Sequence, residues 1–198
     1  MKQLSLLFFL LTANYLTATC QLDKGVWLVG GSGKLYTYNS TFTNPNYRTT
    51  VKYTQIDLSP NIGYFIADKL AAGLKPNFSF FKGSILNQAT VSGTTKFFIG
   101  PFLRYYFLSP DNPFNILTDI SYQVGINQYS TPPKDKGKIS NFSLMAGPEI
   151  FFNSSVGIEL LIGYTKYHES VESSTIGYSD NRKGLQVSIG LQIHLEKN

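Results

Sequence analysis

Several ionisable residues of this 198-residue sequence share the polar side of stretches in which apolar and polar residues alternate. They are Asp57, Lys75, Lys96, Arg104, Asp119, Glu149, Glu159 and His194. Gathered in one interior, such groups could form a proton or ion path, or a catalytic pair of carboxylates. They could also form a salt-bridged plug, because buried charges must be paired. We favour the plug, since its positive and negative members nearly balance.

Arg104 is the expected centre of this set. Glu149 and Glu159 flank the short segment 153–155, and antiparallel pairing across it places both carboxylates opposite one another, pointing inward. Like charges so placed are destabilising unless a cation or a shared proton intervenes. A planar guanidinium can bind two carboxylates at once, and Asp119 can complete the group. The predicted interior charge cluster is Asp57, Lys75, Arg104, Asp119, Glu149 and Glu159.

The sequence predicts no cofactor and no metal site. Residues 30–34, Gly-Gly-Ser-Gly-Lys, are similar to part of a phosphate-binding loop. Leu28 and Leu35 stand where that motif requires Gly and Ser or Thr, and no helix is expected to follow. The sequence holds two histidines, far apart, and one cysteine, which argues against a structural zinc site.

The elements that must position these residues are β-strands. A hydrophobic period of two is typical of a strand with one apolar and one polar face. Such stretches cover residues 27–36, 55–66, 70–81, 96–107, 114–125, 142–152, 156–165 and 184–195. Each can cross the hydrocarbon layer of a bilayer as a tilted strand, which takes about 9–11 residues. The pattern predicts an all-β protein with eight antiparallel strands.

Short and long connections alternate along the chain. The short connections are 67–69, 108–113 and 153–155, and the long polar ones lie near 38–50, 82–95, 127–138 and 168–182. This alternation is typical of an up-and-down transmembrane β-barrel with short periplasmic turns and long extracellular loops. Prolines within strands argue against a soluble sandwich, because each removes a ladder hydrogen bond. These prolines, all on the expected lipid side, are Pro60, Pro76, Pro101 and Pro148.

The N-terminal segment has the layout of a secretory signal peptide. Lys2 precedes an apolar run, and small residues end at Cys20, so we expect cleavage before Gln21. A lipoprotein acylated at Cys20 is the second interpretation. Residues 1–20 are thus the expected signal peptide and 21–198 a single barrel domain in the cell outer membrane. Loss of Lys2 lowers the net charge from +5 to +4.

Several strings resemble a known family. They are P-x-I-G-Y-F-x-x-D-K-L-A-x-G at 60–73, G-P-F-L-R-Y-Y-F at 100–107, G-P-E-I-F-F at 147–152 and V-G-I-E-L-x-I-G-Y at 156–164. Together they resemble the outer-membrane β-barrel domain family common in Bacteroidota, over nearly the whole mature chain. The resemblance implies an eight-stranded barrel of the OmpX or OmpA membrane-domain type. It carries over no activity, because the family has no uniform one.

One alternative is a lipid-modifying hydrolase. His168 and Ser170 share one side of the seventh strand, and Glu172 or Glu169 could act as the orienting acid. The arrangement is similar to the H-x-S pair of outer-membrane lipid A deacylases. A Ser–His pair requires hydrogen-bond contact and an orienting acid. The other interpretation is that these residues open a polar surface loop, which we prefer because short motifs often match by chance.

The predicted function is therefore that of a non-enzymatic outer-membrane barrel with a plugged lumen, serving envelope integrity or surface interaction through its loops. An eight-stranded barrel is only wide enough for its own side chains. Bulky residues should help to fill the interior and prevent an open pore. They are Phe81, Phe98, Phe102, Tyr106 and Phe151.

Basic residues in or beside the expected extracellular loops point to anionic partners. They are Arg48, Lys52, Lys134, Lys136 and Lys138. In this location the expected anions are phosphates of lipopolysaccharide rather than nucleic acid. Outer-membrane lipid is the other expected partner, together with periplasmic chaperones and the barrel-insertion machinery during biogenesis. No particular extracellular ligand is indicated, and we expect a monomer.

Overall fold

A computed structural model of the chain describes residues 22–43, 48–85, 91–129, 136–171 and 178–195. The predicted signal peptide, residues 1–20, lies outside this part of the chain, and its cleavage stays a prediction. Lys134 and Glu172 also lie outside it. Among the described residues, no helix is long and apolar enough to cross a membrane.

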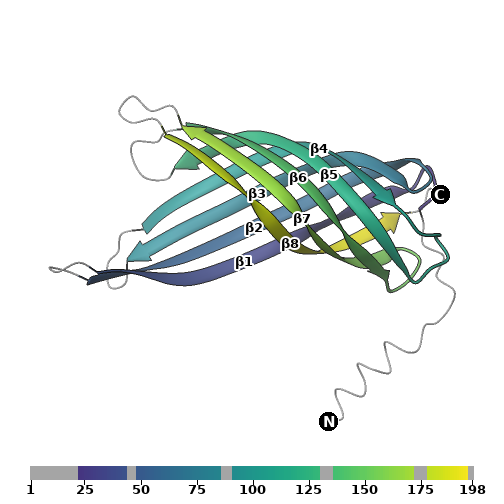
Figure 1. Ribbon diagram of the computed structural model, residues 1–198, viewed down its shortest axis with the longest axis horizontal. Coiled ribbons are helices and arrows are strands. Elements are labelled where there is room, and N and C mark those ends of the chain that lie inside the picture. The colour runs from purple at the N-terminus through teal and green to yellow at the C-terminus, as the bar shows by residue number, and fades with distance from the viewer. Residues whose placement is uncertain (1–21, 44–47, 86–90, 130–135, 172–177, 196–198) are drawn as a thin grey trace, which may run out of the picture.

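The described chain forms a closed barrel in which each strand pairs antiparallel with the next and the first pairs with the last (Figure 1). The strands are β1 (Trp27–Thr43), β2 (Arg48–Ala67), β3 (Leu70–Ile85), β4 (Val91–Tyr106), β5 (Phe114–Tyr129), β6 (Lys136–Phe151), β7 (Val156–Val171) and β8 (Tyr178–Leu195). This order confirms the predicted eight-stranded up-and-down fold.

The two ends of the barrel differ in their connections. At one end, here called the turn end, residues 68–69, 107–113 and 152–155 join consecutive strands, close to the predicted short connections. Lys69 has φ 64°, a conformation typical of tight two-residue hairpins. The first and last strands also start and finish at this end (Figure 1). The opposite end, where β1, β3, β5 and β7 finish, is called the loop end.

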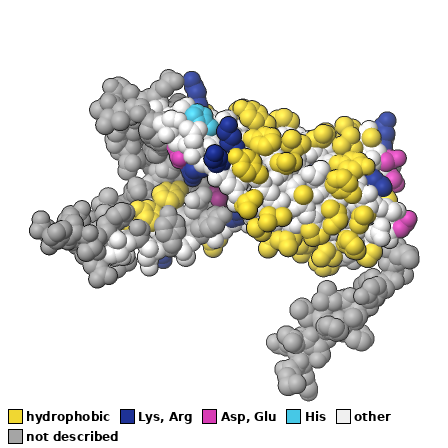
Figure 2. Space-filling model, in the orientation of Figure 1, with side chains coloured by type: hydrophobic (Ala, Val, Ile, Leu, Met, Phe, Trp, Pro, Cys, Tyr) yellow, Lys and Arg dark blue, Asp and Glu magenta, His cyan; other side chains and the backbone are white. Residues whose placement is uncertain are grey.

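The outer surface of the turn-end half is an apolar belt (Figure 2). It covers residues 27–35 of β1, 56–66 of β2, 70–80 of β3, 97–107 of β4, 114–126 of β5, 142–152 of β6, 156–164 of β7 and 185–195 of β8. These segments have about the 9–11 residues that a tilted strand needs to cross hydrocarbon. Outward apolar side chains alternate with inward polar or buried ones, as the sequence pattern predicts.

Beyond the belt the strands continue as a paired collar, which corrects the predicted connections. The collar comprises residues 36–43, 48–55, 81–85, 91–96, 127–129, 136–141, 165–171 and 178–184. Much of what was expected to be long polar loop is therefore strand. In the collar the outward face meets water and is polar, for example at Lys82 and Lys166, whereas Ile139 and Val171 are buried inward. The hydrophobic alternation reverses at the belt edge, so the belt pattern ends while the strands do not.

The prolines within strands each interrupt one ladder and stay paired on their other side. Pairing of β2 with β3 is broken between Leu58↔Phe78 and Ile62↔Leu74, where the register would set Pro60 opposite Pro76. These two prolines share one gap, whereas Gly31↔Pro60 and Pro76↔Ile99 pair normally. The two backbone N–H donors that these prolines lack are therefore both missing from the β2–β3 ladder, and the β1–β2 and β3–β4 ladders stay intact.

The other two prolines follow glycines that make room at the gap. Pro101 interrupts β4–β5 pairing opposite Tyr122, and Pro148 interrupts β6–β7 pairing opposite Leu160. A Cβ on Gly100 would lie 1.9 Å from the Tyr122 carbonyl oxygen, and one on Gly147 would lie 2.0 Å from that of Leu160. The facing carbonyl, deprived of its donor, can approach only because the preceding residue is glycine.

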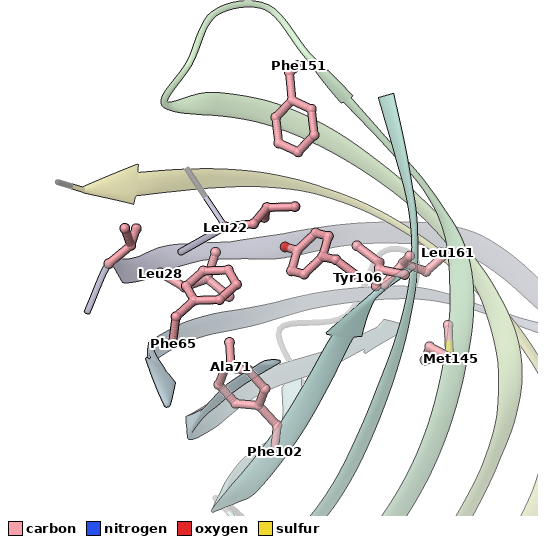
Figure 3. Close-up of a cluster of buried hydrophobic side chains, with 11 residues drawn as sticks. Leu22, Leu28, Phe65, Ala71, Phe102, Tyr106, Met145, Phe151 and Leu161 are labelled. Carbon is pink, nitrogen blue, oxygen red and sulfur yellow. The ribbon is translucent and has the colours of Figure 1, made fainter. Parts of the chain in front are cut away.

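A buried apolar cluster fills the turn end (Figure 3). Its members are Leu22, Val26, Leu28, Phe65, Ala71, Phe102, Tyr106, Leu117, Met145, Phe151 and Leu161. The segment before β1 contributes to it, because the Lys69 amide donates to the Leu22 carbonyl at 2.7 Å and the Phe65 amide donates to the Val26 carbonyl at 2.9 Å. These bonds hold Leu22 inside the end of the barrel, fully buried.

Candidate functional site

The lumen has two unlike halves. The turn-end half holds the apolar cluster and a set of buried charged groups. The other half encloses a cavity of about 730 Å³, lined largely by hydroxyl, amide and charged side chains from all eight strands. The prediction that side chains fill the whole lumen is therefore wrong for the half nearer the loops.

Arg104 binds two carboxylates at the boundary between these halves. Its Nη1 forms an ion pair with Glu159 Oε2 at 2.8 Å, its Nε donates to Asp119 Oδ2 at 3.1 Å, and its Nη2 lies 3.1 Å from the same oxygen. Asp119 Oδ1 also accepts from Lys75 Nζ at 2.5 Å. These four residues, here the Arg104 cluster, carry two positive and two negative charges, so the buried group is neutral as a whole.

Glu149 belongs to a neighbouring network rather than to the Arg104 cluster. The predicted register Glu149↔Glu159 is confirmed, but the two carboxylates find different partners. Tyr106 Oη donates to Glu149 Oε2 at 2.8 Å, and His194 Nε2 lies 3.0 Å from Glu149 Oε1. Because a carboxylate only accepts, Nε2 of His194 carries the hydrogen. We call Tyr106, Glu149 and His194 the Glu149 triad.

Glycines on neighbouring strands leave room for these carboxylates. A Cβ on Gly157 would lie 2.4 Å from Glu149 Oε1, and one on Gly190 would lie 2.7 Å from Glu159 Oε1. Each carboxylate therefore lies across a strand position that has no side chain. Gly157 and Glu159 both occur in the V-G-I-E-L string, so the motif encodes an acid together with the space its neighbour needs.

Asp57, the remaining member of the predicted cluster, and Lys96, another inward charge, lie apart from the Arg104 cluster. Asp57 lines the cavity on β2 and accepts from Gln55 Nε2 at 2.9 and 3.0 Å. Lys96 lies further toward the loops and binds Glu169. The structure thus brings together Lys75, Arg104, Asp119 and Glu159, holds Glu149 beside them, and leaves Asp57 separate.

Glu169 is the centre of a second ionic group, in the collar. Its Oε2 accepts from Lys96 Nζ and Tyr167 Oη, both at 2.6 Å, and Asn127 Nδ2 donates to its Oε1. Arg182 lies 4.6 Å from the Tyr167 ring centroid. Burial of the Glu169 carboxyl raises its pKa, but the bonds from Lys96 and Tyr167 outweigh burial and lower the pKa to about 2. Burial and the adjacent Glu169 raise the pKa of the Tyr167 hydroxyl.

The residues of the hydrolase alternative do not assemble into a catalytic pair. They lie within β7, not in a loop as expected. His168 Nδ1 bonds Asn181 Oδ1 at 2.8 Å, and among the described residues no hydrogen bond joins His168 to Ser170. Glu169 points to the opposite face of the strand, into the collar group, so it cannot orient His168.

Other candidate chemistry is also missing from the part of the chain that the structure describes. No group of three or more His, Cys, Asp or Glu side chains could hold a metal ion there. Residues 30–34, similar to a phosphate loop, run within β1. A Cβ on Gly30 would lie 2.2 Å from Gln192 Oε1, so this glycine makes room for a buried amide.

Sequence reasoning missed two sets of functional residues. The uncharged polar residues of the cavity wall, most of them Ser, Asn and Gln, carry no chemical motif, although their inward parity was readable. Leu22 lies before the first strand, where alternation gives no signal. Its burial follows from a hydrogen bond with Lys69, which only the folded hairpin brings near.

Comparison with known proteins identifies a family. A family model described as "Outer membrane protein beta-barrel domain" matches residues 73–198. No curated protein matches the chain. Among solved structures, outer membrane protein OprG from Pseudomonas aeruginosa is 14% identical, with a TM-score of 0.49, covering 91% of this chain and 100% of its own. Neisserial surface protein A (NspA) is 12% identical, with a TM-score of 0.46, covering 86% and 97%.

The family match spans more than half of the chain, and it includes the strands that supply Arg104, Asp119, Glu149 and Glu159. It agrees with the closed eight-stranded barrel and its apolar belt. The chain belongs to the outer membrane protein β-barrel domain family, and it is an outer-membrane β-barrel protein.

Proposed function

We propose that the protein is a non-enzymatic, non-conducting outer-membrane barrel that is closed at its periplasmic end and acts at the cell surface. Short turns face the periplasm in barrels of this kind, so the turn end is the periplasmic end. The observation that carries the proposal is the division of the lumen. Apolar and ionic side chains occupy the periplasmic half, and a polar cavity occupies the outer half.

Closure rests on rings and ion pairs that meet across the barrel axis. The rings of Phe65 and Tyr106 lie 5.8 Å apart, and those of Phe151 and His194 lie 5.5 Å apart, between centroids. All four side chains are buried. At the inner end of the cavity, which its four residues line, the neutral Arg104 cluster leaves no unpaired charge to attract an ion through the closure.

Planar-bilayer recording tests this proposal. We expect no steady conductance from the refolded wild-type barrel above that of a mock preparation. Phe65→Ala with Tyr106→Ala removes two closing rings and should produce open events. The matched control is Phe80→Ala with Phe97→Ala, which removes two rings from the lipid-facing side. Steady wild-type conductance would contradict the proposal, and gel mobility before and after heating shows whether each variant has folded.

We further propose that the outer rim of the belt binds phosphates of lipopolysaccharide. Exposed lysines follow directly above the belt: Lys52, Lys82, Lys138, Lys166 and Lys183. Lys166 and Lys183 are register partners on β7 and β8. Like charges directly opposite are destabilising, and a bound phosphate would relieve that repulsion. Basic side chains and a histidine side chain lie together at this rim in Figure 2.

Lipopolysaccharide should raise the unfolding temperature of the refolded barrel, and Lys166→Ser with Lys183→Ser should reduce that rise. The control, Lys24→Ser with Lys69→Asn, removes equal charge from the turn end; Asn tolerates the positive φ of Lys69. Dephosphorylated lipopolysaccharide should lose most of the effect. An equal rise in the wild type and in Lys166→Ser with Lys183→Ser would sink this part of the proposal.

A further inference from the structure

The seam between β1 and β8 is the least paired seam of the barrel. Its ladder runs from Trp27↔Leu195 to Ser32↔Gly190 and stops there. On its other side β1 pairs with β2 as far as Thr43↔Arg48, and β8 pairs with β7 as far as Val171↔Tyr178. Among the described residues, the facing edges 33–43 of β1 and 178–189 of β8 therefore lack their ladder partners.

Part of this unpaired seam lies at the depth of the belt. The belt extends to Leu35 on β1 and begins at Leu185 on β8. Unpaired strand edges are not tolerated where they face hydrocarbon alone, but they are tolerated where they line a water-filled cavity. The lumen cavity reaches these edges, because Lys34 of β1 and Gln186 and Ser188 of β8 all line it.

The two sides of the seam have opposite chemistry. Outward, its side chains are apolar and unusually exposed: Leu35 71%, Leu185 81%, Val187 59% and Ile189 63%. Inward, hydroxyl, amide and ammonium groups line the cavity, among them Gln186. An occupant of the seam would thus meet hydrocarbon on one side and polar groups on the other. Of the molecules in an outer leaflet, an amphiphile has this division.

We propose that the unpaired β1–β8 seam is a lateral opening through which an amphiphile with an acyl chain enters from the outer leaflet, placing its polar head group in the lumen cavity. A strand from a second copy is a weaker occupant, because pairing on these edges would leave the polar cavity unused. The inference rests on the proposed function in one respect only: the lumen is taken to be closed at its periplasmic end and hollow in its outer half. Failure of the conductance test leaves the lipid test below unaffected.

Fluorescence quenching by lipids with brominated acyl chains tests the opening. Trp27 is the only tryptophan, so Trp27→Phe gives a dark background. In that background, Ser188→Trp reports from the luminal side of the seam, and Ser121→Trp reports from a luminal position that is paired on both sides, with Phe102 and with Ser143. Val187→Trp, on the lipid side, gives the quenching of full lipid contact. The barrels are refolded into phosphatidylcholine vesicles with and without bromine on the acyl chains.

We expect bromine to quench Ser188→Trp nearly as strongly as Val187→Trp and to leave Ser121→Trp almost unchanged. Equal, weak quenching at Ser188→Trp and Ser121→Trp would overturn the proposal. Heat-dependent gel mobility identifies variants that fail to fold. For that case Gln186→Trp, at the seam, and Ser79→Trp, at a position paired with both Asp57 and Lys96, form a second pair of luminal reporters.

An engineered disulfide across the seam provides an independent test. Continuing the existing register would set Leu35 opposite Val187, and Cys20 is the only native cysteine. Leu35→Cys with Val187→Cys should remain reduced without oxidant, because the edges are apart. Forced oxidation should close the seam and lower the quenching of Ser188→Trp. Spontaneous and complete intramolecular oxidation would show a closed seam, and disulfide-linked dimers of Val187→Cys alone would indicate a second copy; either overturns the proposal.

Discussion

The periplasmic and outer halves of the lumen share the same eight strands but differ in what they enclose. In the periplasmic half, glycines such as Gly157 and Gly190 let long charged and aromatic side chains lie flat across neighbouring strands. In the outer half, short side chains such as Ser59 and Ser143 leave a cavity. Strand number sets the width of the barrel, but side-chain length decides whether that width is filled.

The largest effect should follow loss of Arg104 in the filled half. Removing one partner of a buried ion pair typically costs about 3–5 kcal/mol, because the other charge is left uncompensated. Arg104→Ala leaves Asp119 with Lys75 but strips Glu159 of its cation. The variant should unfold at clearly lower urea, measured by fluorescence of Trp27 in vesicles.

Adding Glu159→Gln should recover part of that loss, and adding Glu149→Gln should not, because Glu149 is held by Tyr106 and His194. A wild-type midpoint for Arg104→Ala, or equal rescue by both glutamines, would contradict the assignment of the Arg104 cluster.

A somewhat smaller effect is expected from the segment that enters the periplasmic end. Leu22 is fully buried there, and truncating a buried leucine to alanine costs about 2–5 kcal/mol. Leu22→Ala should fall at the lower end of that range, since a terminal segment can readjust. Urea unfolding measures the change, with the exposed Leu74→Ala as control. Equal midpoints for the two variants would show that this segment contributes nothing to closure.

The collar should respond to pH through the carboxyl group of Glu169. The pKa of Glu169 is lowered from its usual 4.5 to about 2. A depressed carboxyl pKa contributes stability that is fully present above the unfolded pKa and is lost as pH falls through the folded pKa. The stability difference between wild type and Glu169→Gln should therefore be greatest above pH 4.5 and shrink toward pH 2. A difference independent of pH across that window would refute the collar assignment.

The smallest effect is expected in the hollow half. Ser143 lines the cavity on β6 and is only partly buried. Ser143→Ala should change the free energy of unfolding by less than about 0.5 kcal/mol, as surface substitutions usually do. Met145→Ala, two residues along the same strand and buried in the apolar cluster, should cost several times more. Similar losses for both variants would mean that the boundary between the halves is misplaced.

The belt could be predicted from the sequence because lipid imposes a single rule on it. Outward residues must be apolar, so alternation locates the strands and their short turns. The collar escaped prediction because water replaces lipid outside it, and residues such as Ile139 and Val171 turn their apolar side chains inward. A prediction that expects every outward residue to be apolar therefore ends each strand at the belt edge, where the apolar residues begin to point inward.

The sequence predicted which charged residues point into the lumen, but not which of them bind one another. Parity correctly placed Glu149, Glu159 and Arg104 inside, and hairpin pairing set Glu149 opposite Glu159. It could not assign Glu149 to His194, because β6 and β8 are not neighbours and approach only across the lumen. The early end of the β1–β8 ladder was equally hidden, since nothing in the alternation of either strand changes where their pairing stops.

The contacts inside the lumen also bear on how fast the barrel can form. Asn61 and Gln192 exchange hydrogen bonds of 3.0 and 3.2 Å across a sequence separation of 131 residues. Contacts this far apart in sequence slow folding, because much loop-closure entropy is lost before they form. The periplasmic interior also draws on β4, β6 and β8 through the Glu149 triad. Sealing of the lumen and meeting of the first and last strands should therefore be a single late kinetic step.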